Sequence, residues 1–588
     1  MNPDGPYRRG RETVIQEGAA IAYVGMNPGG AGVAANRMES DGAMPVSKHK
    51  TLDRLPPVLL VVVAALVRFA LCARYLSGDE TRILKNAVNF FTQHTLLPVH
   101  YRYPTLFSYL SAIPIRAGAF LLTVRGMIPS FPHLYDLHMN DSILPILPAR
   151  LTSAALGVMT VVILLKIGEK FYDRNTGLFA AAILALSNIH AYYSGYAFPD
   201  ATMTLFAACS IFFALSALHD GSLRNYILAG ACAGLAAATK YNGALIMLVI
   251  LCVHIVRVDH PRRLLSIRYH GPAALSVLFF ACAFVAGSPG WLLNPKPFWL
   301  GLMYERGHMA TGDPWDAGIP YIRQAWSAWH WEKTTAVLFA LGLIYALYRR
   351  RKTDVVLLIA CVACFVYIGG LGKKDIHYML FLFPALALLS GRMLSEAHAA
   401  LKRTAAPSIG ILLIFCALAW PAYTALSQAG RQVLPDNRTI AGEWIQNNIE
   451  EGAKIVVDWA YIPKLYISST EFITGRRNAE NAAPGRAPKK LRLYMHVPFL
   501  HGTEYLVNVD AKYLMTSSGC YERYIDPPPP PRTPSTTDYY KLRDTYSALL
   551  FDAGAYGWRL RKRFDGGKGP EILIFERTND ADSPGSMK

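Results

Sequence analysis

Two adjacent acids open the part of this sequence that could carry chemistry. Asp79 and Glu80 follow directly after a long apolar run, in the stretch YLSGDETRILKNAVNFF that begins at Tyr75. An ionisable side chain close to a membrane segment is costly unless it is paired, hydrated or functional. We therefore expect this acid pair to take part in catalysis or binding, although a solvated helix boundary would have the same local sequence.

Further charged and aromatic residues recur at similar positions, each near the edge of an apolar run. They are Tyr101, Arg102 and Tyr103 in VHYRYPTL, Arg150 in PARLTSAALG, Asp200 in YAFPDATM, Lys240 in TKYNG, and Lys373, Lys374, His377 and Tyr378 in GKKDIHYMLF. Asp200 could equally cap a helix, and interfacial lysine, arginine and tyrosine are common membrane anchors. A carboxylate can accept the proton of an attacking hydroxyl while cations hold a phosphate whose bond to a sugar breaks. The set therefore suits sugar transfer from a lipid phosphate.

The composition indicates the environment in which these residues work. Of the 588 residues, 52% are hydrophobic and only 17% are charged, which is typical of a polytopic membrane protein surrounded by lipids. The net charge of +18 comes largely from Lys and Arg in short clusters between apolar segments, so it indicates topology and argues against nucleic acid as a partner. Neither a GxxxxGK[ST] loop nor a GxGxxG turn is present, so a nucleotide-sugar donor is not expected.

Eleven apolar segments are long enough, or nearly so, to cross a bilayer as helices. Basic clusters such as SKHKTLDR, KIGEKFYDR and RRRK fall on one side when these spans are threaded in order, and that side is assigned to the cytoplasm. The stretch 103–125 would reverse this order if it crossed, so we expect an interfacial helix there. The spans cover about residues 56–76, 147–167, 176–197, 201–219, 224–240, 241–257, 272–290, 334–348, 354–371, 376–395 and 407–426.

Three parts of the chain follow from this threading. Residues 1–50 lack periodicity and are expected to be a disordered cytoplasmic tail, residues 51–430 a transmembrane domain, and residues 431–588 a domain outside the membrane. The last part alternates helical patterns with the strand patterns KIVVDW, AKYLMTSS and PEILIFER. The predicted fold class is an all-α membrane protein with a C-terminal periplasmic α/β domain.

The motifs resemble those of polytopic glycosyltransferases of the GT-C fold, in particular the bacterial group related to protein O-mannosyltransferases and to the lipid A aminoarabinose transferase (glycosyltransferase family 39-like). The matching pieces are GDE, YRYPTLFSYL, the block from Arg150 to Gly243, and KKDIHYMLFLFPALALLSG, which together cover about residues 55–395. The resemblance implies an inverting transferase of the bacterial inner membrane. Such an enzyme takes a sugar from a polyprenyl-phosphate donor at the periplasmic face and passes it to a lipid, glycan or protein acceptor.

The resemblance also implies roles for individual residues. The usual base of the family corresponds to Asp79, with Glu80 and Asp200 positioning the acceptor or a metal. Some members bind a divalent metal near these acids, for which Asp79 and Asp200 would be ligands here, and others work without one. The residues expected to bind substrate, several of them through the lipid phosphate, are Tyr101, Arg102, Tyr103, Arg150, Lys240, Lys373, Lys374, His377 and Tyr378.

Other functions stay open at the level of the sequence. A transporter or lipid flippase also has ionisable groups among its spans, but it would place them near the bilayer midplane and often has inverted repeats, which are not evident here. A glycan ligase or oligosaccharyltransferase would use a diphosphate carrier instead of a monophosphate. A membrane receptor or scaffold would leave the charges of the outer face without a purpose.

Overall fold

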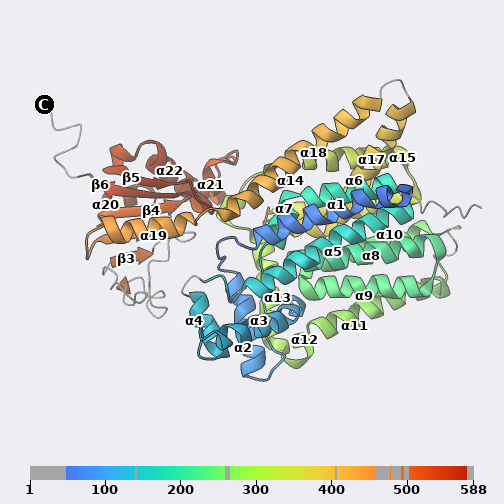
Figure 1. The fold of residues 1–588 in the computed structure, drawn as a ribbon, viewed down its shortest axis with the longest axis horizontal. Coiled ribbons are helices and arrows are strands. Elements are labelled where there is room, and N and C mark those ends of the chain that lie inside the picture. The colour runs from blue at the N-terminus through green and yellow to red at the C-terminus, as the bar shows by residue number, and fades with distance from the viewer. Residues whose placement is uncertain are drawn as a thin grey trace, which may run out of the picture. The chain divides into compact units, whose positions relative to one another are not determined.

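Apolar helices form the larger part of the protein (Figure 1). The computed structural model describes residues 48–139, 142–258, 262, 265–403, 407–458, 477–478, 492–495 and 502–578. Most of the expected tail, residues 1–50, lies outside these ranges. Each of the eleven predicted spans coincides with one helix or with two consecutive helices, because helix formation satisfies the backbone hydrogen bonds of a long apolar run in lipid.

Within the described residues, seven helical segments are long and apolar enough to cross a membrane. They are α3 (Leu106–Val124), α5 (Leu147–Phe171), α8 (Asp200–Asp220), α11 (Gly271–Gly287) with η4 (Ile267–His270), α16 (Lys352–Gly370), α17 (Phe383–Arg403) with η6 (Ile376–Leu382), and α18 (Pro407–Gly430). Shorter apolar helices are the Leu55–Leu71 part of α1 (Lys48–Leu71), α6 (Arg174–Leu186), α10 (Met247–Val256) with η2 (Tyr241–Ile246), and α15 (Thr334–Arg349). The total of eleven crossings and the interfacial position of α3 remain predictions.

Short helices gather at the end of the long helices where α5 and α8 begin (Figure 1). Among them, α2 packs against α3 and α4, and α3 also contacts α5 and α9. The short elements are α2 (Glu80–Thr92), η1 (Phe131–His133), α4 (Leu134–Met139), α12 (Gly290–Leu293), α13 (Pro295–Thr311), η5 (Pro314–Asp316) and α14 (Pro320–Glu332), whereas α9 (Leu223–Thr239) lies alongside the long helices α8 and α11.

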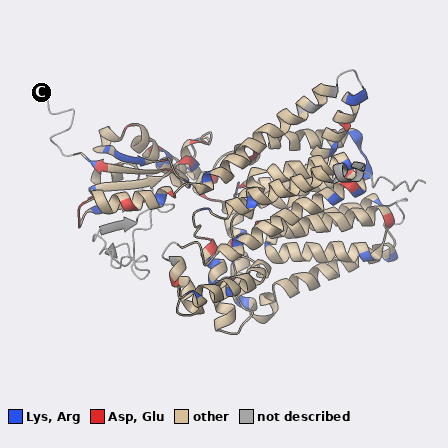
Figure 2. Ribbon diagram, viewed as in Figure 1, with Lys and Arg blue, Asp and Glu red and all other residues tan. Residues whose placement is uncertain are grey.

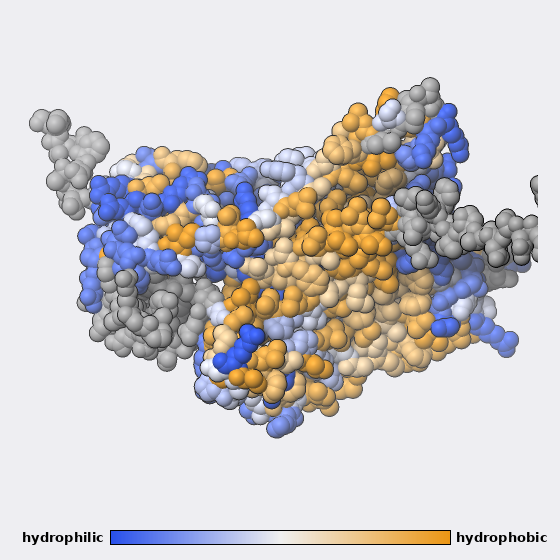
Figure 3. Space-filling view, viewed as in Figure 1, coloured by the Kyte–Doolittle hydropathy of each residue, from blue (hydrophilic) through white to orange (hydrophobic). Residues whose placement is uncertain are grey.

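The surface of the long helices is apolar along their middles. Figure 2 shows charged residues mainly at the helix ends, and Figure 3 shows hydrophobic surface over the same helices. Large apolar side chains such as Phe279, Leu412 and Phe415 are exposed on α11 and α18. An apolar surface of this extent belongs in lipid, since water would drive it to associate. The chain is therefore an integral membrane protein.

A break between α6 and α7 (Asn188–Ser194) is stabilised on one side by a buried arginine. Arg68, from α1, donates hydrogen bonds to the carbonyl oxygens of Leu184 and Ala185, each at 3.0 Å, and lies 2.7 Å from Nδ1 of His190. The last carbonyls of a helix have no partner within the helix and carry partial negative charge. Arg68 therefore binds the unpaired carbonyls at the C-terminal end of α6 and compensates their partial negative charge.

A buried acid stabilises the other side of the same break. The carboxylate of Glu332, at the end of α14, accepts hydrogen bonds from the hydroxyl of Ser187 at 2.7 Å and from the backbone N–H of Ile189 at 2.9 Å. These donors belong to the start of α7, where a negative charge is favourable. Burial nevertheless raises the pKa of Glu332 to about 7. The break directs α7 and the segment after it toward the N-terminal part of α5.

The C-terminal α/β region (residues 437–577) contains a six-stranded sheet in its described residues, with the order β2-β3-β1-β4-β6-β5. β1 pairs in parallel with β3 and β4, and the other pairs are antiparallel. The strands are β1 (Lys454–Val457), β2 (Arg477–Asn478), β3 (Arg492–Met495), β4 (Tyr513–Ser517), β5 (Trp558–Phe564) and β6 (Ile572–Arg577). The strands predicted from KIVVDW, AKYLMTSS and PEILIFER are thus confirmed, whereas the domain boundary at residue 430 remains a prediction.

Helices cover both faces of this sheet. Ile445 of α19 (Asn437–Asn448) packs in one buried cluster with Ile455 of β1. Tyr546 of α22 packs in a second buried cluster with Val456, the next residue of β1. Successive residues of a strand point to opposite faces, so β1 contributes to both clusters. The remaining elements are η7 (Arg431–Val433), α20 (Thr503–Asn508), α21 (Ser518–Ile525), η9 (Pro534–Thr536), α22 (Thr537–Phe551) and η10 (Ala553–Tyr556).

We predict that Glu332 makes the stability of the fold depend on pH. Its carboxyl titrates near 4.5 when unburied and near 7 in the fold. Its contribution is therefore fully present below about pH 4.5 and is lost as the pH rises through about 7. Glu332→Gln keeps an acceptor for Ser187 and Ile189, so the variant should lose less thermal stability than the wild type between pH 5.5 and 8. Tm in detergent measures this, with Glu169→Gln as the surface control. Equal slopes for wild type and Glu332→Gln would contradict the prediction.

Candidate functional site

A fully buried ion pair joins Glu80, the first residue of α2, to Arg150 on α5. The guanidinium donates from Nε to Oε1 at 2.7 Å and from Nη2 to Oε2 at 2.5 Å, and neither side chain is exposed. The backbone N–H groups of Ser77 and Ala197 donate to the same carboxylate at 3.0 and 2.8 Å. Four donors therefore surround Glu80. A bidentate pair with further hydrogen bonds is the arrangement in which a buried carboxylate stays charged.

Arg150 also holds the loop that follows α1. Its remaining N–H groups donate to the backbone carbonyls of Cys72 at 2.9 Å, Arg74 at 2.7 Å and Tyr75 at 3.0 Å. With the two bonds to Glu80, all five guanidinium N–H donors are used. From the sequence, Arg150 was predicted to bind the lipid phosphate, and Glu80 was predicted to position the acceptor or a metal. In the structure both are bound to the protein itself, which favours a positioning role for the pair.

Asp79, the neighbour of Glu80, has a very different environment. Its side chain is 51% exposed, and Oδ1 lies 3.2 Å from Nη1 of Arg82, one turn along α2. Because an exposed ion pair of this kind is weak, the carboxylate of Asp79 can exchange Arg82 for another partner. Of the two acids in the GDE motif, Asp79 is therefore the one accessible from solvent.

A second buried ion pair brings together residues from distant parts of the chain. Nζ of Lys240, between α9 and η2, lies 2.8 Å from Oδ1 of Asp200, at the start of α8, and both side chains are buried. The ammonium of Lys240 also lies 4.6 Å from the ring centre of Tyr378 and 5.8 Å from that of Tyr103. The structure thus brings together four of the predicted site residues.

Tyr103 connects this pair with the exposed acid. Burial raises the pKa of its hydroxyl, and the negative charges of Asp79, Glu305 and Asp200 raise it further. The effect of a charge on a pKa falls with its distance from the titrating group. Three acids, Asp79, Asp200 and Glu305, therefore lie in the neighbourhood of Tyr103. We call these three acids the acid cluster.

Glu305, on α13, was not predicted from the sequence. Burial raises the pKa of its carboxyl, whereas the charges of His308, Arg102 and Lys240 lower it. Arg102 reaches the same helix, because its guanidinium lies 4.0 Å from the ring centre of Tyr304. The only local signal was the charged run ERGH within an aromatic segment, and an amphipathic surface helix would have the same pattern.

Tyr101 lies against the same part of the chain. Its hydroxyl accepts a hydrogen bond from Nδ2 of Asn294 at 3.1 Å. Close packing continues at α13, where a Cβ added to Gly301 would lie 2.3 Å from the backbone oxygen of Tyr101. The backbone of the YRY motif therefore rests directly on α13, which holds Arg102 and Tyr103 near Glu305.

The basic-aromatic motif begins with a lysine that the protein itself neutralises. Nζ of Lys373 lies 2.6 Å from Oδ2 of Asp313 and 3.0 Å from Oδ2 of Asp316, both in the turn around η5. Burial alone would lower the pKa of Lys373, but Asp316, Asp375 and Asp313 raise it. Lys374 differs, because its Nζ donates to the backbone oxygen of Gly369 at 3.1 Å and burial lowers its pKa.

The end of the same motif combines an acid with stacked rings. His377 stacks on Tyr193 with ring centres 4.7 Å apart, and its Nδ1 lies 3.0 Å from Oδ1 of Asp375. Burial alone would raise the pKa of Asp375, but His377, Lys373 and Arg523 hold it below its usual range. Arg523 belongs to α21, so the C-terminal α/β region also faces this motif.

The predicted metal site does not fit the arrangement of these residues. Within the described part of the chain, no three His, Cys, Asp or Glu side chains are grouped so that they could hold a metal ion. Of the two expected ligands, Asp200 is bound by the ammonium of Lys240, which would repel a divalent cation. We therefore assign no step of a reaction to a metal.

Comparison with known families agrees with the sequence motifs. Residues 143–286 match the model of a family described as dolichyl-phosphate-mannose-protein mannosyltransferase. This stretch contains Arg150, Asp200 and Lys240, and it includes the block from Arg150 to Gly243. The resemblance to polytopic membrane glycosyltransferases that the motifs predicted is thereby confirmed. No curated protein matches the chain.

Three solved structures are similar over different shares of the chain. The crystal structure of ArnT from Cupriavidus metallidurans bound to undecaprenyl phosphate has 15% sequence identity to this chain and a TM-score of 0.46. The match covers 88% of this chain and 97% of ArnT. The archaeal oligosaccharyltransferase AglB from Archaeoglobus fulgidus shows 13% identity and a TM-score of 0.47, with 81% of this chain and 71% of AglB covered. The structure of the S. cerevisiae Pmt1–Pmt2 complex bound to the sugar donor has 20% sequence identity and a TM-score of 0.31. The match covers 46% of this chain and 36% of the matched chain.

We predict that the two acids of the GDE motif differ in their effect on stability. Glu80→Gln leaves the guanidinium of Arg150 buried without its counter-charge, a change that typically costs about 3–5 kcal/mol of the free energy of unfolding. Asp79→Asn removes a charge that is half exposed and should leave the stability nearly unchanged. The Tm of the two variants, purified in the same detergent, measures the difference. Equal Tm values would contradict the assignment of Glu80 as the structural acid.

Proposed function

We propose that this protein is a glycosyltransferase of the bacterial inner membrane that moves a sugar from a polyprenyl-phosphate donor to a lipid, glycan or protein acceptor. The observation that carries the proposal is the accessible carboxylate of Asp79 beside a buried pair that holds its loop. The match to a family named for a dolichyl-phosphate sugar donor supports the donor class. The reaction would take place at the periplasmic face, with the N-terminus in the cytoplasm and the C-terminus in the periplasm.

Asp79 acts as the base in this mechanism. Its carboxylate accepts the proton of the acceptor hydroxyl while the hydroxyl oxygen attacks the anomeric carbon of the donor sugar. The bond between that carbon and the phosphate oxygen breaks, and the polyprenyl phosphate leaves with the bonding electrons. Because attack and departure occur on opposite faces of the carbon, the configuration inverts. A positioned base contributes about 10²–10⁴-fold to the rate of such a step.

The departing phosphate needs cations that carboxylates do not already neutralise. Arg150 and Lys373 are both bound by acids of the protein. Among the predicted cations, Arg102 stacks on an aromatic ring and Lys374 donates to a backbone carbonyl, and neither forms an ion pair within the described ranges. We assign the phosphate contact to Arg102 and Lys374. Lys240 is neutralised by Asp200, so it is given no phosphate contact; its ammonium lies beside the ring of Tyr378.

The remaining predicted residues frame the acceptor in this proposal. Asp200 orients Lys240, and Tyr101 and Tyr103 line the acid cluster on the side of α13. His377, stacked on Tyr193, lies at the end of the basic-aromatic motif. Glu305 adds a third carboxylate that can accept a hydrogen bond from an acceptor hydroxyl. Aromatic rings with a few convergent polar groups are the usual lining of a sugar-binding or lipid-binding site.

We predict that Asp79→Asn lowers sugar transfer by at least about 100-fold, because the amide cannot accept the hydroxyl proton. The variant should enter the membrane and unfold at the same temperature as the wild type. Asp136→Asn is the matched control, since Asp136 is an exposed acid of the neighbouring helix α4. Its transfer rate should equal that of the wild type. A normal rate for Asp79→Asn would refute the role of Asp79.

A donor panel tests the class of substrate. Purified protein is supplied with polyprenyl-phosphate monosaccharides and, in parallel, with polyprenyl-diphosphate oligosaccharides, and membrane lipids and proteins are analysed by mass spectrometry. We expect a mass increment of one sugar with a monophosphate donor only, and the increment identifies sugar and acceptor class together. Transfer from the diphosphate donors alone would instead make the protein a glycan ligase or an oligosaccharyltransferase.

A further inference from the structure

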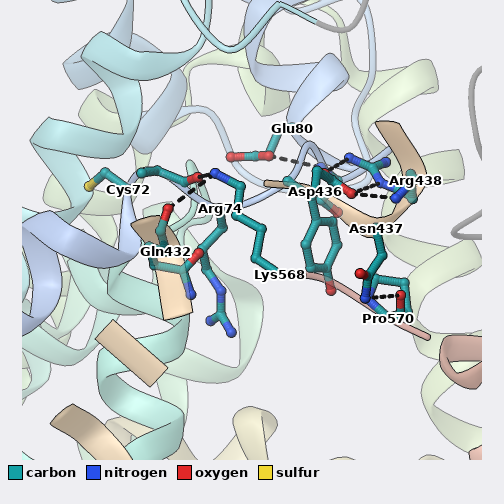
Figure 4. A network of polar contacts seen from close by, with 12 residues as sticks. Cys72, Arg74, Glu80, Gln432, Asp436, Asn437, Arg438, Lys568 and Pro570 are labelled. Atoms are coloured by element: carbon teal, nitrogen blue, oxygen red, sulfur yellow. Dashed lines mark hydrogen bonds and ion pairs between the residues drawn. The ribbon is translucent and has the colours of Figure 1, made fainter. Parts of the chain in front are cut away.

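A lysine at the tip of the hairpin between β5 and β6 reaches the loop that follows α1. Nζ of Lys568 donates to the backbone oxygen of Ala73 at 2.8 Å and to that of Gln432 at 3.3 Å. Figure 4 shows Lys568 extended from the C-terminal α/β region toward Cys72, Arg74 and Gln432. One ammonium group thus links the chain just after α1 with the chain just after α18, the first and last of the apolar helices.

Backbone hydrogen bonds hold the hairpin tip in place. The N–H of Lys568 donates to the oxygen of Pro435 at 2.8 Å, and the oxygen of Lys568 accepts from the N–H of Asn437 at 2.9 Å. The N–H of Gly567 donates to Oδ1 of Asn437 at 2.7 Å. The tip therefore cannot move independently of the segment that leads from α18 into α19, and the ammonium group is held ready for Ala73 at little further entropic cost.

The same part of the C-terminal α/β region contacts the loop at a second point, Tyr75. The guanidinium of Arg438 lies 5.0 Å from the centre of the Tyr75 ring. Gly569 has a φ of +89°, and a Cβ at this position would lie 3.3 Å from Cδ1 of Tyr75. Glycine is the residue that adopts such a backbone without strain and leaves this space to the ring. Two contacts on one side therefore restrain the loop.

Arg150 restrains the same loop through its carbonyl oxygens. The carbonyls of Cys72, Arg74 and Tyr75 accept the hydrogen bonds of Arg150, and Arg150 is bound in turn by Glu80. Ala73, the residue held by Lys568, lies between two of these acceptors. The loop is thus clamped by hydrogen bonds to Arg150 and to the hairpin. The clamped segment ends only a few residues before Asp79.

We propose that the hairpin between β5 and β6 is a positioning element of the candidate active site, with Lys568 as its positioning residue. Lys568 holds residues 72–76 against Arg150, and this keeps Asp79 in a fixed place at the outer end of the helices. The inference rests on the proposed role of Asp79 as the base. It makes the C-terminal α/β region a working part of the transferase. Displacement of a catalytic group by about 1 Å can cost about 10²-fold in rate.

Kinetics of three variants test the proposal. Lys568→Ala should lower kcat by about 10- to 100-fold and change KM for the polyprenyl-phosphate sugar by less than about twofold, because Lys568 acts through the loop. Lys568→Arg keeps a cationic donor for the carbonyls and should recover most of kcat. Lys562→Ala, at an exposed position of β5, should match the wild type. An unchanged kcat in Lys568→Ala, or a change confined to KM, would overturn the proposal.

A second measurement does not depend on sugar transfer. A nitroxide label is attached to Gly78→Cys, a site where no atom lies within 4 Å of the added Cβ, after the exposed Cys282 and Cys416 are replaced by Ser. Lys568→Ala should narrow the spectrum of the label, because the loop beside Asp79 becomes more mobile, and Lys562→Ala should not.

The two measurements separate the possible failures. If no variant transfers sugar but the label responds to Lys568→Ala, the proposed function fails and the clamp stands. If the label does not respond and transfer is normal in every variant, the proposed function stands and the positioning role of the hairpin is refuted.

Discussion

The arrangement of the chain around the start of α5 depends on the buried ion pair between Glu80 and Arg150. Removing two charges from water costs several kcal/mol for each ion, and their attraction offsets this only when the other hydrogen bonds are made as well. Here Glu80 accepts from four N–H groups, and Arg150 donates through all five of its own. A pair satisfied in this way ties α2 and α5 to the loop after α1 and to the segment before α8.

This constraint explains why two neighbouring carboxylates have different environments. Consecutive residues at the start of a helix point in directions about 100° apart, so one can face the interior while the other faces solvent. Glu80 is enclosed by the pair, and Asp79 is left at the surface with the weakly held Arg82. The structural acid and the proposed catalytic acid are therefore adjacent in the sequence, and the first fixes the backbone from which the second projects.

Pairing within the protein also limits how its cations can act on a substrate. Asp200 binds Lys240, and Asp313 and Asp316 together bind Lys373. Glu80 binds Arg150 in the same way. Opposite charges attract strongly where the dielectric constant is low, so a basic residue near the membrane surface is often neutralised before any ligand arrives. The C-terminal α/β region takes part in the same network: the ring of Trp315 lies 5.1 Å from Nζ of Lys373 and 4.6 Å from the guanidinium of Arg523.

The sequence by itself determined the positions of the apolar helices, the strands β1, β4 and β6, and the charged residues near the helix ends. These depend on runs and periods of a few to about 20 residues, so no distant contact is needed to recognise them. Only the tertiary structure decided that Glu80 is enclosed while Asp79 is exposed, that Glu305 joins Asp79 and Asp200, and that Lys568 reaches Ala73. Ion pairs and hydrogen bonds depend on distances of a few ångströms between side chains. Glu80 and Arg150 are 70 residues apart in the chain, and their distance in space is set by the packing of every helix between them.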